Sequence, residues 1–190
     1  MTNKEALVII DMQYFFISTA LKTYASDIVP AVKIVPAIKN CLYEARQFQV
    51  PIIHIKTEYK EDKSNWPKTW LHYDSLYCMH GTHEAEIISE ISPIENEAII
   101  IKSRFSGFFK TDLEAWLVKN DINSVVIAGY ALDGCVRFTA VDAFNLGIKT
   151  TILSDCVMAA QEDTKSSLEY LQFLIQSSVI ESKLWLSSFH

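Results

Sequence analysis

Three residues able to take part in covalent chemistry follow apolar runs that are typical of buried strands. Asp11 directly follows the first run, Lys102 follows the third, and Cys135 lies in the turn after the fourth. Because the carboxyl ends of parallel strands meet at one edge of a sheet, these side chains can converge although they are far apart in sequence. A carboxylate can take the proton of a thiol, and an ammonium group favours the thiolate. The thiol, the carboxylate and the ammonium group are the three types of side chain that catalysis by a cysteine nucleophile requires.

Cys135 lies where the chain passes from a strand into a helix. Val125 to Ala128 is a buried run ended by Gly129, and the residues after Cys135 change to helical spacing. The first N–H groups of a helix are unpaired and its dipole favours negative charge, which predicts a thiol pKa below the ordinary value. Asp133 is expected to cap this helix. The alternative for Cys135 is a small apolar residue that fills the turn.

Apolar runs alternate with helical patterns along the whole chain. Runs that are uniformly apolar and separated by helices predict an α/β fold with a parallel sheet covered on both faces. A loop is expected over residues 13–20, a long polar connection rich in Trp and Tyr over 58–80, and a short helix over 83–91. The expected strands cover residues 6–10, 51–57, 97–101, 125–128 and 149–153, with a short sixth strand at 179–180.

Composition limits the class of protein. A chain of 190 residues fits a single domain, here residues 1–190, with its own core. The net charge of −6 and the scattered Lys and Arg residues argue against binding to nucleic acid or to an anionic membrane. No apolar run is long enough to span a membrane, and the first residues show no signal peptide, which predicts a cytoplasmic protein with a small-molecule partner. The four cysteines are widely spaced and form neither a disulfide framework nor a zinc-binding pattern.

Four segments resemble the isochorismatase-like cysteine hydrolases, a family that includes nicotinamidases, N-carbamoylsarcosine amidohydrolases and ureidoacrylate-type amidohydrolases. They occur in the family's order and extend over nearly the whole chain. The resemblance implies a three-layer α-β-α fold with a doubly wound, mostly parallel sheet of about six strands in the order 3-2-1-4-5-6. The segments are VIIDMQYFF, HGTHEAEI, IIIKSRFSGFFKTDLEAWL and VVIAGYALDGCVRFTAVDAFNLGIKTTILSDCV.

The resemblance also implies a role for each candidate catalytic residue. Asp11 would be the general base, Lys102 the stabilising cation and Cys135 the nucleophile. The backbone N–H groups of Ala131 and Cys135 would form an oxyanion hole, with a non-proline cis peptide bond between Tyr130 and Ala131. The reaction would be hydrolysis of a C–N bond in a small amide or ureido compound through a thioester intermediate.

Two differences from members of this family narrow the range of activities expected for this protein. Nicotinamidases hold a metal through an Asp-x-His pair after the second strand, and this chain has Glu58, Tyr59 and Lys60 there. A protonated lysine cannot bind a metal, so we expect neither a metal nor another cofactor. Isochorismatases proper lack the cysteine nucleophile, so Cys135 favours C–N hydrolysis over their vinyl ether cleavage.

Aromatic residues are the candidate substrate contacts. Phe16 and Phe109 occupy positions that commonly face substrate in the family, Trp66 and Trp70 lie on the variable loop, and Tyr130 precedes the expected cis bond. The family also implies a homodimer or a higher homo-oligomer. The alternative function is that of a catalytically idle family member that acts as a binding or interaction protein.

Overall fold

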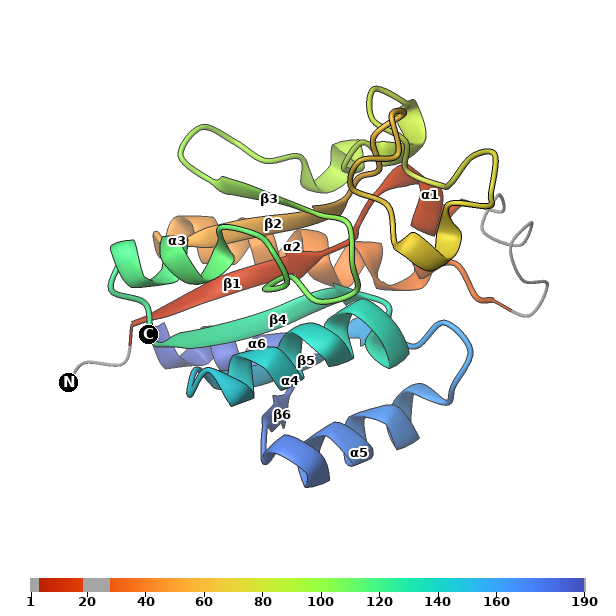
Figure 1. Cartoon of the computed structure of the whole chain (residues 1–190). Coiled ribbons are helices and arrows are strands. Elements are labelled where there is room, and N and C mark those ends of the chain that lie inside the picture. The colour runs from red at the N-terminus through yellow and green to blue at the C-terminus, as the bar shows by residue number, and fades with distance from the viewer. Residues whose placement is uncertain (1–3, 19–27, 190) are drawn as a thin grey trace.

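The computed structural model describes residues 4–18 and 28–189. Within them, six parallel strands form a sheet in the order β3-β2-β1-β4-β5-β6 (Figure 1). The predicted fold class and strand order are therefore confirmed. The strands are β1 (Glu5–Ile10), β2 (Ile52–Thr57), β3 (Ala98–Lys102), β4 (Ser124–Tyr130), β5 (Lys149–Met158) and β6 (Ser178–Ile180).

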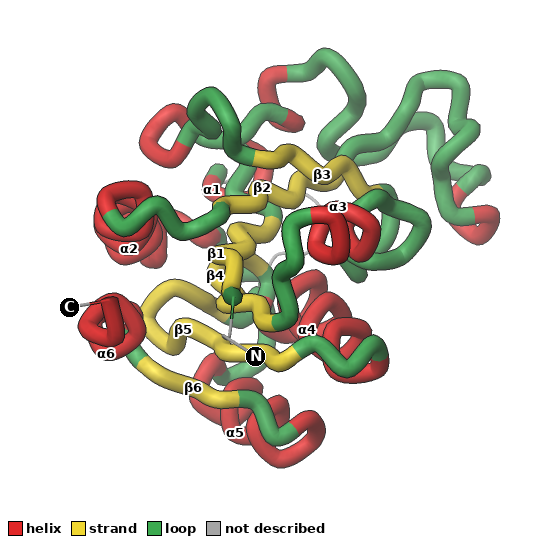
Figure 2. Tube along the Cα trace, turned by 90° about the vertical axis from the view of Figure 1, so that its left-hand side faces the viewer, coloured by secondary structure: helices red, strands yellow, loops and turns green. Residues whose placement is uncertain are grey.

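Helices cover both faces of this sheet. Figure 2 looks along the strands and shows α2 and α6 on one side and α3, α4 and α5 on the other. Each side has its own apolar core, packed against alternate side chains of the same strands. The helices are α1 (Tyr14–Ile17), α2 (Val35–Gln47), α3 (Leu113–Lys119), α4 (Arg137–Asn145), α5 (Thr164–Ile175) and α6 (Ser182–Leu186).

The chain reverses its direction of winding between β1 and β4. From β1 it moves outward through β2 to β3, then returns to add β4 on the other side of β1. In open parallel sheets this switch point opens a crevice at the carboxyl ends of the strands, where ligands bind. The strand ends that carry Asp11 and Tyr130 flank that crevice.

Gly129 allows β1 and β4 to lie close together at this point. Its φ is +120°, and a Cβ atom added there would lie 2.1 Å from the carbonyl oxygen of Ile10. No other residue type fits this contact without moving the backbone. Directly beyond Ile10, Asp11 has a φ of +51°, a left-handed conformation in which Asp is found more often than most residues. The backbone therefore turns as soon as β1 ends.

Some predicted elements differ from the observed ones. The segment after β1 contains the short helix α1 as well as loop, because Phe15 and Phe16 bury their rings in the core; the part of the expected loop beyond Ser18 lies outside the described residues. The prediction of one helix over residues 83–91 is wrong, since two separate 3-10 turns, His83–Ala85 and Ser89–Ile91, occur there. β5 is five residues longer than expected, as a register irregularity lets it continue beside β4. Over the described ranges, no helix is both long and apolar enough to cross a membrane.

Candidate active site

The strand ends bring Asp11, Lys102 and Cys135 into direct contact, as their positions predict. The Nζ atom of Lys102 lies 2.8 Å from Oδ2 of Asp11 and donates a hydrogen bond to Sγ of Cys135 at 3.2 Å. Asp11 and Lys102 are almost fully buried. The structure therefore places the predicted base, cation and nucleophile in one cluster.

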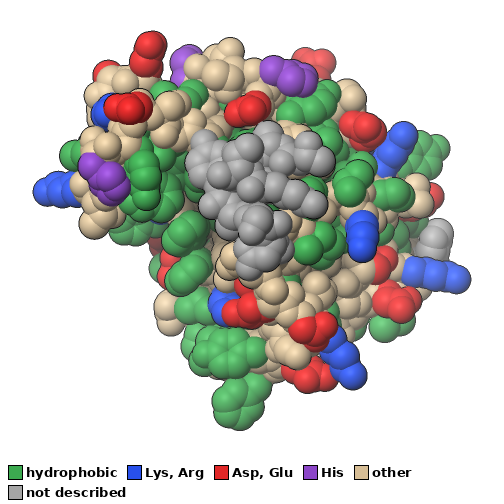
Figure 3. Space-filling view, turned by 90° about the vertical axis from the view of Figure 1, so that its right-hand side faces the viewer, with side chains coloured by type: hydrophobic (Ala, Val, Ile, Leu, Met, Phe, Trp, Pro, Cys, Tyr) green, Lys and Arg blue, Asp and Glu red, His purple; other side chains and the backbone are tan. Residues whose placement is uncertain are grey.

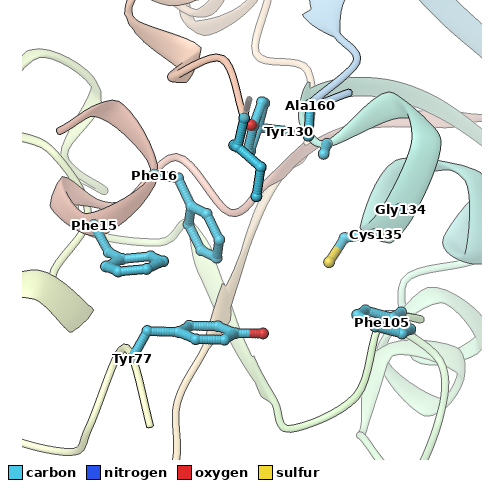
Figure 4. Close-up of a pocket in the computed structure, with 10 residues that line it drawn as sticks. Phe15, Phe16, Tyr77, Phe105, Tyr130, Gly134, Cys135 and Ala160 are labelled. Carbon is cyan, nitrogen blue, oxygen red and sulfur yellow. The ribbon is translucent and has the colours of Figure 1, made fainter. Parts of the chain in front are cut away.

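A local helical irregularity positions the cysteine. After β4 the chain forms a π-helical turn, Leu132–Val136, which is kinked at Gly134 and leads into α4. Cys135 is the fourth residue of this turn and so lies just before α4 begins. Its side chain points into a cavity, as Figure 4 shows. The peptide bond between Tyr130 and Ala131 is cis, which confirms that prediction.

Asp133 has a different role from the one predicted. Neither the π-helical turn nor α4 has a side-chain cap. The Asp133 carboxylate instead accepts hydrogen bonds from the backbone N–H groups of Ala160, Gln161 and Glu162, at 2.7, 2.8 and 3.1 Å. It thereby ties the cysteine turn to the segment between β5 and α5, because three converging N–H groups satisfy a carboxylate better than one helix end.

The charges of the cluster determine its protonation. Burial by itself lowers the pKa of Lys102, but the adjacent Asp11 carboxylate raises it above its ordinary value, so the ammonium form is retained. Burial and the negative charge of Asp11 raise the pKa of Cys135 to about 12, against the lowering effect of Lys102. The resting cluster therefore holds a carboxylate, an ammonium and a neutral thiol.

This state differs from the low thiol pKa expected from the helix N-terminus. Loss of a proton from Cys135 to solvent would leave a buried net charge of −1, which low-dielectric surroundings disfavour. Transfer of the same proton to Asp11 keeps the cluster neutral. The geometry therefore supports proton transfer within the cluster at the moment of attack rather than a preformed thiolate.

A cavity of about 170 Å³ adjoins the cysteine. Figure 4 shows its aromatic walls, with the Cys135 sulfur pointing into the space between Phe105 and Tyr77. A cavity of about 150 Å³ lined by apolar groups holds benzene in another protein, so a six-membered ring fits this volume. The described lining consists of Phe15, Phe16, Ile28, Tyr77, Phe105, Tyr130, Ala131, Gly134, Cys135 and Ala160.

The predicted substrate contacts divide into two groups. Phe16 and Tyr130 line the cavity. Trp66 does not, because it packs against Tyr59 and Leu76 in a separate small core beneath the long connection, and Trp70 packs against that core.

Phe109 is also outside the cavity lining. The residue is 48% exposed. Phe105, four residues earlier, lines the cavity instead and stacks on Phe138 of α4, with ring centroids 5.4 Å apart. Gly107 lies between the two phenylalanines and packs against Ile55 and Thr139. This close packing fixes the path of the loop and brings Phe105 to the cavity.

Sequence reasoning missed Phe15, Tyr77 and Phe105 as lining residues. Phe15 and Tyr77 stack with centroids 4.9 Å apart, although they are far apart in the chain. Tyr77 lies at the end of the long connection, whose aromatic residues were the signal that could have pointed to it. Burial raises the pKa of Tyr77 well above its ordinary value, so its hydroxyl group is neutral.

The place where nicotinamidases hold a metal has other contacts here. Oε2 of Glu58 lies 3.0 Å from Nζ of Lys56, and Oε1 lies 2.9 Å from Nδ1 of His80. Although burial acts in the opposite direction, the hydrogen bonds from His80 and Lys56 lower the pKa of Glu58. This carboxylate is therefore part of an ion-pair network.

Charges of both signs surround the carboxyl edge of the sheet. Figure 3 faces this edge and shows acidic and basic side chains interspersed, without a field of one sign. Two arginines near the site already have partners: Arg104 donates to the carbonyl oxygens of Asn65 and Trp66, and Arg137 pairs with Glu162. In the described structure these guanidinium groups are used for internal contacts.

Comparison with known proteins identifies the family. Residues 5–181 match the family model of the isochorismatase domain. The chain therefore belongs to the isochorismatase family, and it is a hydrolase of that family, as the four sequence segments predict.

Three relatives illustrate the range of similarity. The isochorismatase family protein YaaI of Bacillus subtilis (strain 168) is 29% identical, with 92% of each chain covered. The maleamate amidohydrolase of Pseudomonas putida (strain KT2440) is 27% identical over 82% of this chain and 72% of its own. The solved structure of N-carbamoylsarcosine amidase from Thermoplasma acidophilum is 29% identical and superposes with a TM-score of 0.80, covering 94% of this chain and 96% of its own.

The charge balance predicts how Cys135 reacts in variants. Removing the negative neighbour in Asp11→Asn should lower the apparent pKa of Cys135 in the pH profile of its alkylation by iodoacetamide. Replacing the cation in Lys102→Met should raise that apparent pKa. Peptide mass spectrometry across a pH series measures Cys135 separately from the other three cysteines. An equal apparent pKa in wild type and Asp11→Asn would contradict a resting thiol held neutral by the Asp11 carboxylate.

Proposed function

We propose that this protein is a cysteine-dependent amidohydrolase that acts on a small, uncharged amide or ureido compound through a thioester intermediate. The observation that carries the proposal is the contact of Lys102 with both Asp11 and Cys135 at the edge of an apolar cavity. The named activities of two relatives, maleamate amidohydrolase and N-carbamoylsarcosine amidase, support C–N hydrolysis.

The first half of the reaction forms the thioester. The Cys135 sulfur attacks the carbonyl carbon while its proton passes to Asp11, so the cluster stays neutral. The backbone N–H groups of Ala131 and Cys135 would stabilise the resulting oxyanion, and Lys102 would stabilise the developing negative charge on sulfur. Asp11 then gives the proton to the leaving nitrogen. The C–N bond breaks and releases ammonia or an amine.

The second half of the reaction hydrolyses the thioester. Asp11, again a carboxylate, takes a proton from water as that water attacks the carbonyl carbon. The carbon–sulfur bond breaks, the thiol recovers its proton and the acid leaves. One amide and one water give one acid and one amine. No step requires a cofactor.

The cavity favours an acyl group that is flat or apolar and has no charge. Its described walls are aromatic rings and small apolar groups. The hydroxyl of Tyr130 donates to the carbonyl oxygen of Val29 at 2.7 Å and is therefore occupied outside the reaction. A substrate carboxylate placed among the described lining residues would lose its hydration without gaining a cationic partner. Stacking and area burial would supply most of the binding energy.

Release of ammonia from small amides tests the proposed function. Purified protein should hydrolyse members of a panel of aromatic and aliphatic primary amides and ureas. Cys135→Ala and Asp11→Asn should each lose at least about 100-fold in kcat, since each removes a nucleophile or a base. A coupled glutamate dehydrogenase assay measures the ammonia.

The matched control for this assay is Cys41→Ala, which removes a buried thiol of α2 outside the site and should leave kcat unchanged. Unchanged ammonia release in Cys135→Ala would overturn the proposal. The absence of turnover with every amide and urea would favour the alternative, a catalytically idle binding protein. The homo-oligomer expected from the family stays a prediction.

Substrate charge provides a separate prediction. Two amides of the same heavy-atom count, 4-methylpentanamide and succinamate, differ in whether the end group is an isopropyl or a carboxylate. The apolar walls predict a kcat/KM at least about tenfold higher for the uncharged amide. Parallel ammonia-release assays measure both values. A preference for succinamate would show that a cation reaches the cavity.

A further inference from the structure

We infer that Thr57 is a positioning residue of the reaction and acts through Asp11 and Lys102. This inference rests on the proposed function and extends it to a residue outside the candidate catalytic residues Asp11, Lys102 and Cys135. Thr57 is the last residue of β2, which lies between β1 and β3 in the sheet. Its neighbours at the sheet edge are therefore the strand ends that carry the base and the cation.

The Thr57 hydroxyl lies between the two charged groups. Nζ of Lys102 donates to Oγ1 of Thr57 at 2.7 Å, and this oxygen lies 2.9 Å from Oδ1 of Asp11. An ammonium group can only donate, so Thr57 must accept from Lys102 and give its single hydrogen to Asp11. The directions of both hydrogen bonds are thus fixed by chemistry.

Two hydrogens of the Lys102 ammonium have defined acceptors, Oγ1 of Thr57 at 2.7 Å and Sγ of Cys135 at 3.2 Å. Oδ2 of Asp11 lies 2.8 Å from the same nitrogen as its ion-pair partner and accepts no hydrogen bond among the described residues. Two hydrogen bonds to different acceptors fix the rotation of the ammonium group. Thr57 therefore aims one N–H of Lys102 at the sulfur by holding another.

The same hydroxyl selects the oxygen of Asp11 that works as the base. Oδ1 already accepts the hydrogen of Thr57, so Oδ2 is the oxygen left to receive the proton of Cys135. A carboxylate held by such a bond cannot turn its working oxygen away from the thiol. Thr57 thus orients the base as well as the cation.

A second buried residue holds Thr57 itself. The Gln13 side chain accepts from the backbone N–H of Thr57 and donates to its carbonyl oxygen, both at 2.8 Å. The same amide nitrogen also donates to the carbonyl oxygen of Ala85 at 2.8 Å. Gln13 is fully buried and lies two residues beyond Asp11, so it fixes the end of β2 relative to the base.

Kinetics of threonine variants test this role. Thr57→Val keeps the shape of the side chain and removes the hydroxyl, and should lower kcat by roughly 10- to 100-fold with KM changed less than about threefold. Thr57→Ser keeps the hydroxyl and should retain kcat within about threefold of wild type. Thr151→Val, a buried threonine of β5, controls for the same substitution elsewhere in the sheet and should leave kcat unchanged.

The outcomes separate this inference from the proposed function. Three outcomes would each overturn the role of the hydroxyl. The first is an unchanged kcat in Thr57→Val, and the second is a change in that variant confined to KM. The third is a loss of kcat in Thr57→Ser equal to that in Thr57→Val. If Thr57→Val does not fold, as judged by its thermal transition, Thr57→Ala removes the same hydroxyl and the same criteria apply. Failure of the wild-type protein to hydrolyse any amide or urea would instead refute the proposed function.

Discussion

The ion pair between Asp11 and Lys102 is the interaction on which the site depends. Burying two charges costs more free energy than their attraction usually returns, and well-packed apolar residues in such positions are often more stable. A buried pair in direct contact with a thiol is therefore better explained by reactivity than by stability. It keeps an acceptor for the thiol proton and a cation for the developing thiolate in one neutral cluster.

The doubly wound sheet brings these groups together without making them neighbours in sequence. β1, β2 and β3 lie side by side and end at the same edge, and each contributes one side chain to the cluster, Asp11, Thr57 or Lys102. β4 adds Cys135 from the other side of the switch point. The close contact of Gly129 with Ile10 brings the end of β4 against the end of β1. The reactive geometry is thus a direct result of strand order.

The sequence predicted those parts of the site that follow strongly patterned elements. Asp11, Lys102 and Cys135 follow apolar runs, so their shared edge could be inferred from parallel strand ends alone. Thr57 also ends a strand, but a threonine carries no distinct chemical signal until its hydrogen-bond partners are known. Phe105 and Tyr77 reach the cavity through loop paths, which apolar periodicity does not describe. Trp66 packs in a small core beneath the long connection, because an aromatic residue on such a connection can pack beneath it as easily as against a substrate.

The protonation of Cys135 also depended on three-dimensional information. Its position before a helix predicted a stabilised thiolate, whereas burial and the contact with Asp11 raise its pKa. A helix terminus is visible in sequence, but the depth of burial and the sign of the nearest charge are not. Because the thiol of Cys135 stays protonated at rest, it needs a proton acceptor at the moment of attack. The base is therefore essential to the proposed mechanism.

Direct detection of the thioester tests whether Cys135 is the nucleophile. The protein would be mixed with an intact amide that it hydrolyses, quenched in acid within milliseconds and digested for peptide mass spectrometry. We expect a transient mass increase, equal to the amide minus ammonia, on the peptide that contains Cys135. Ammonia release with no such adduct, or with the acyl group on another residue, would contradict Cys135 as the nucleophile.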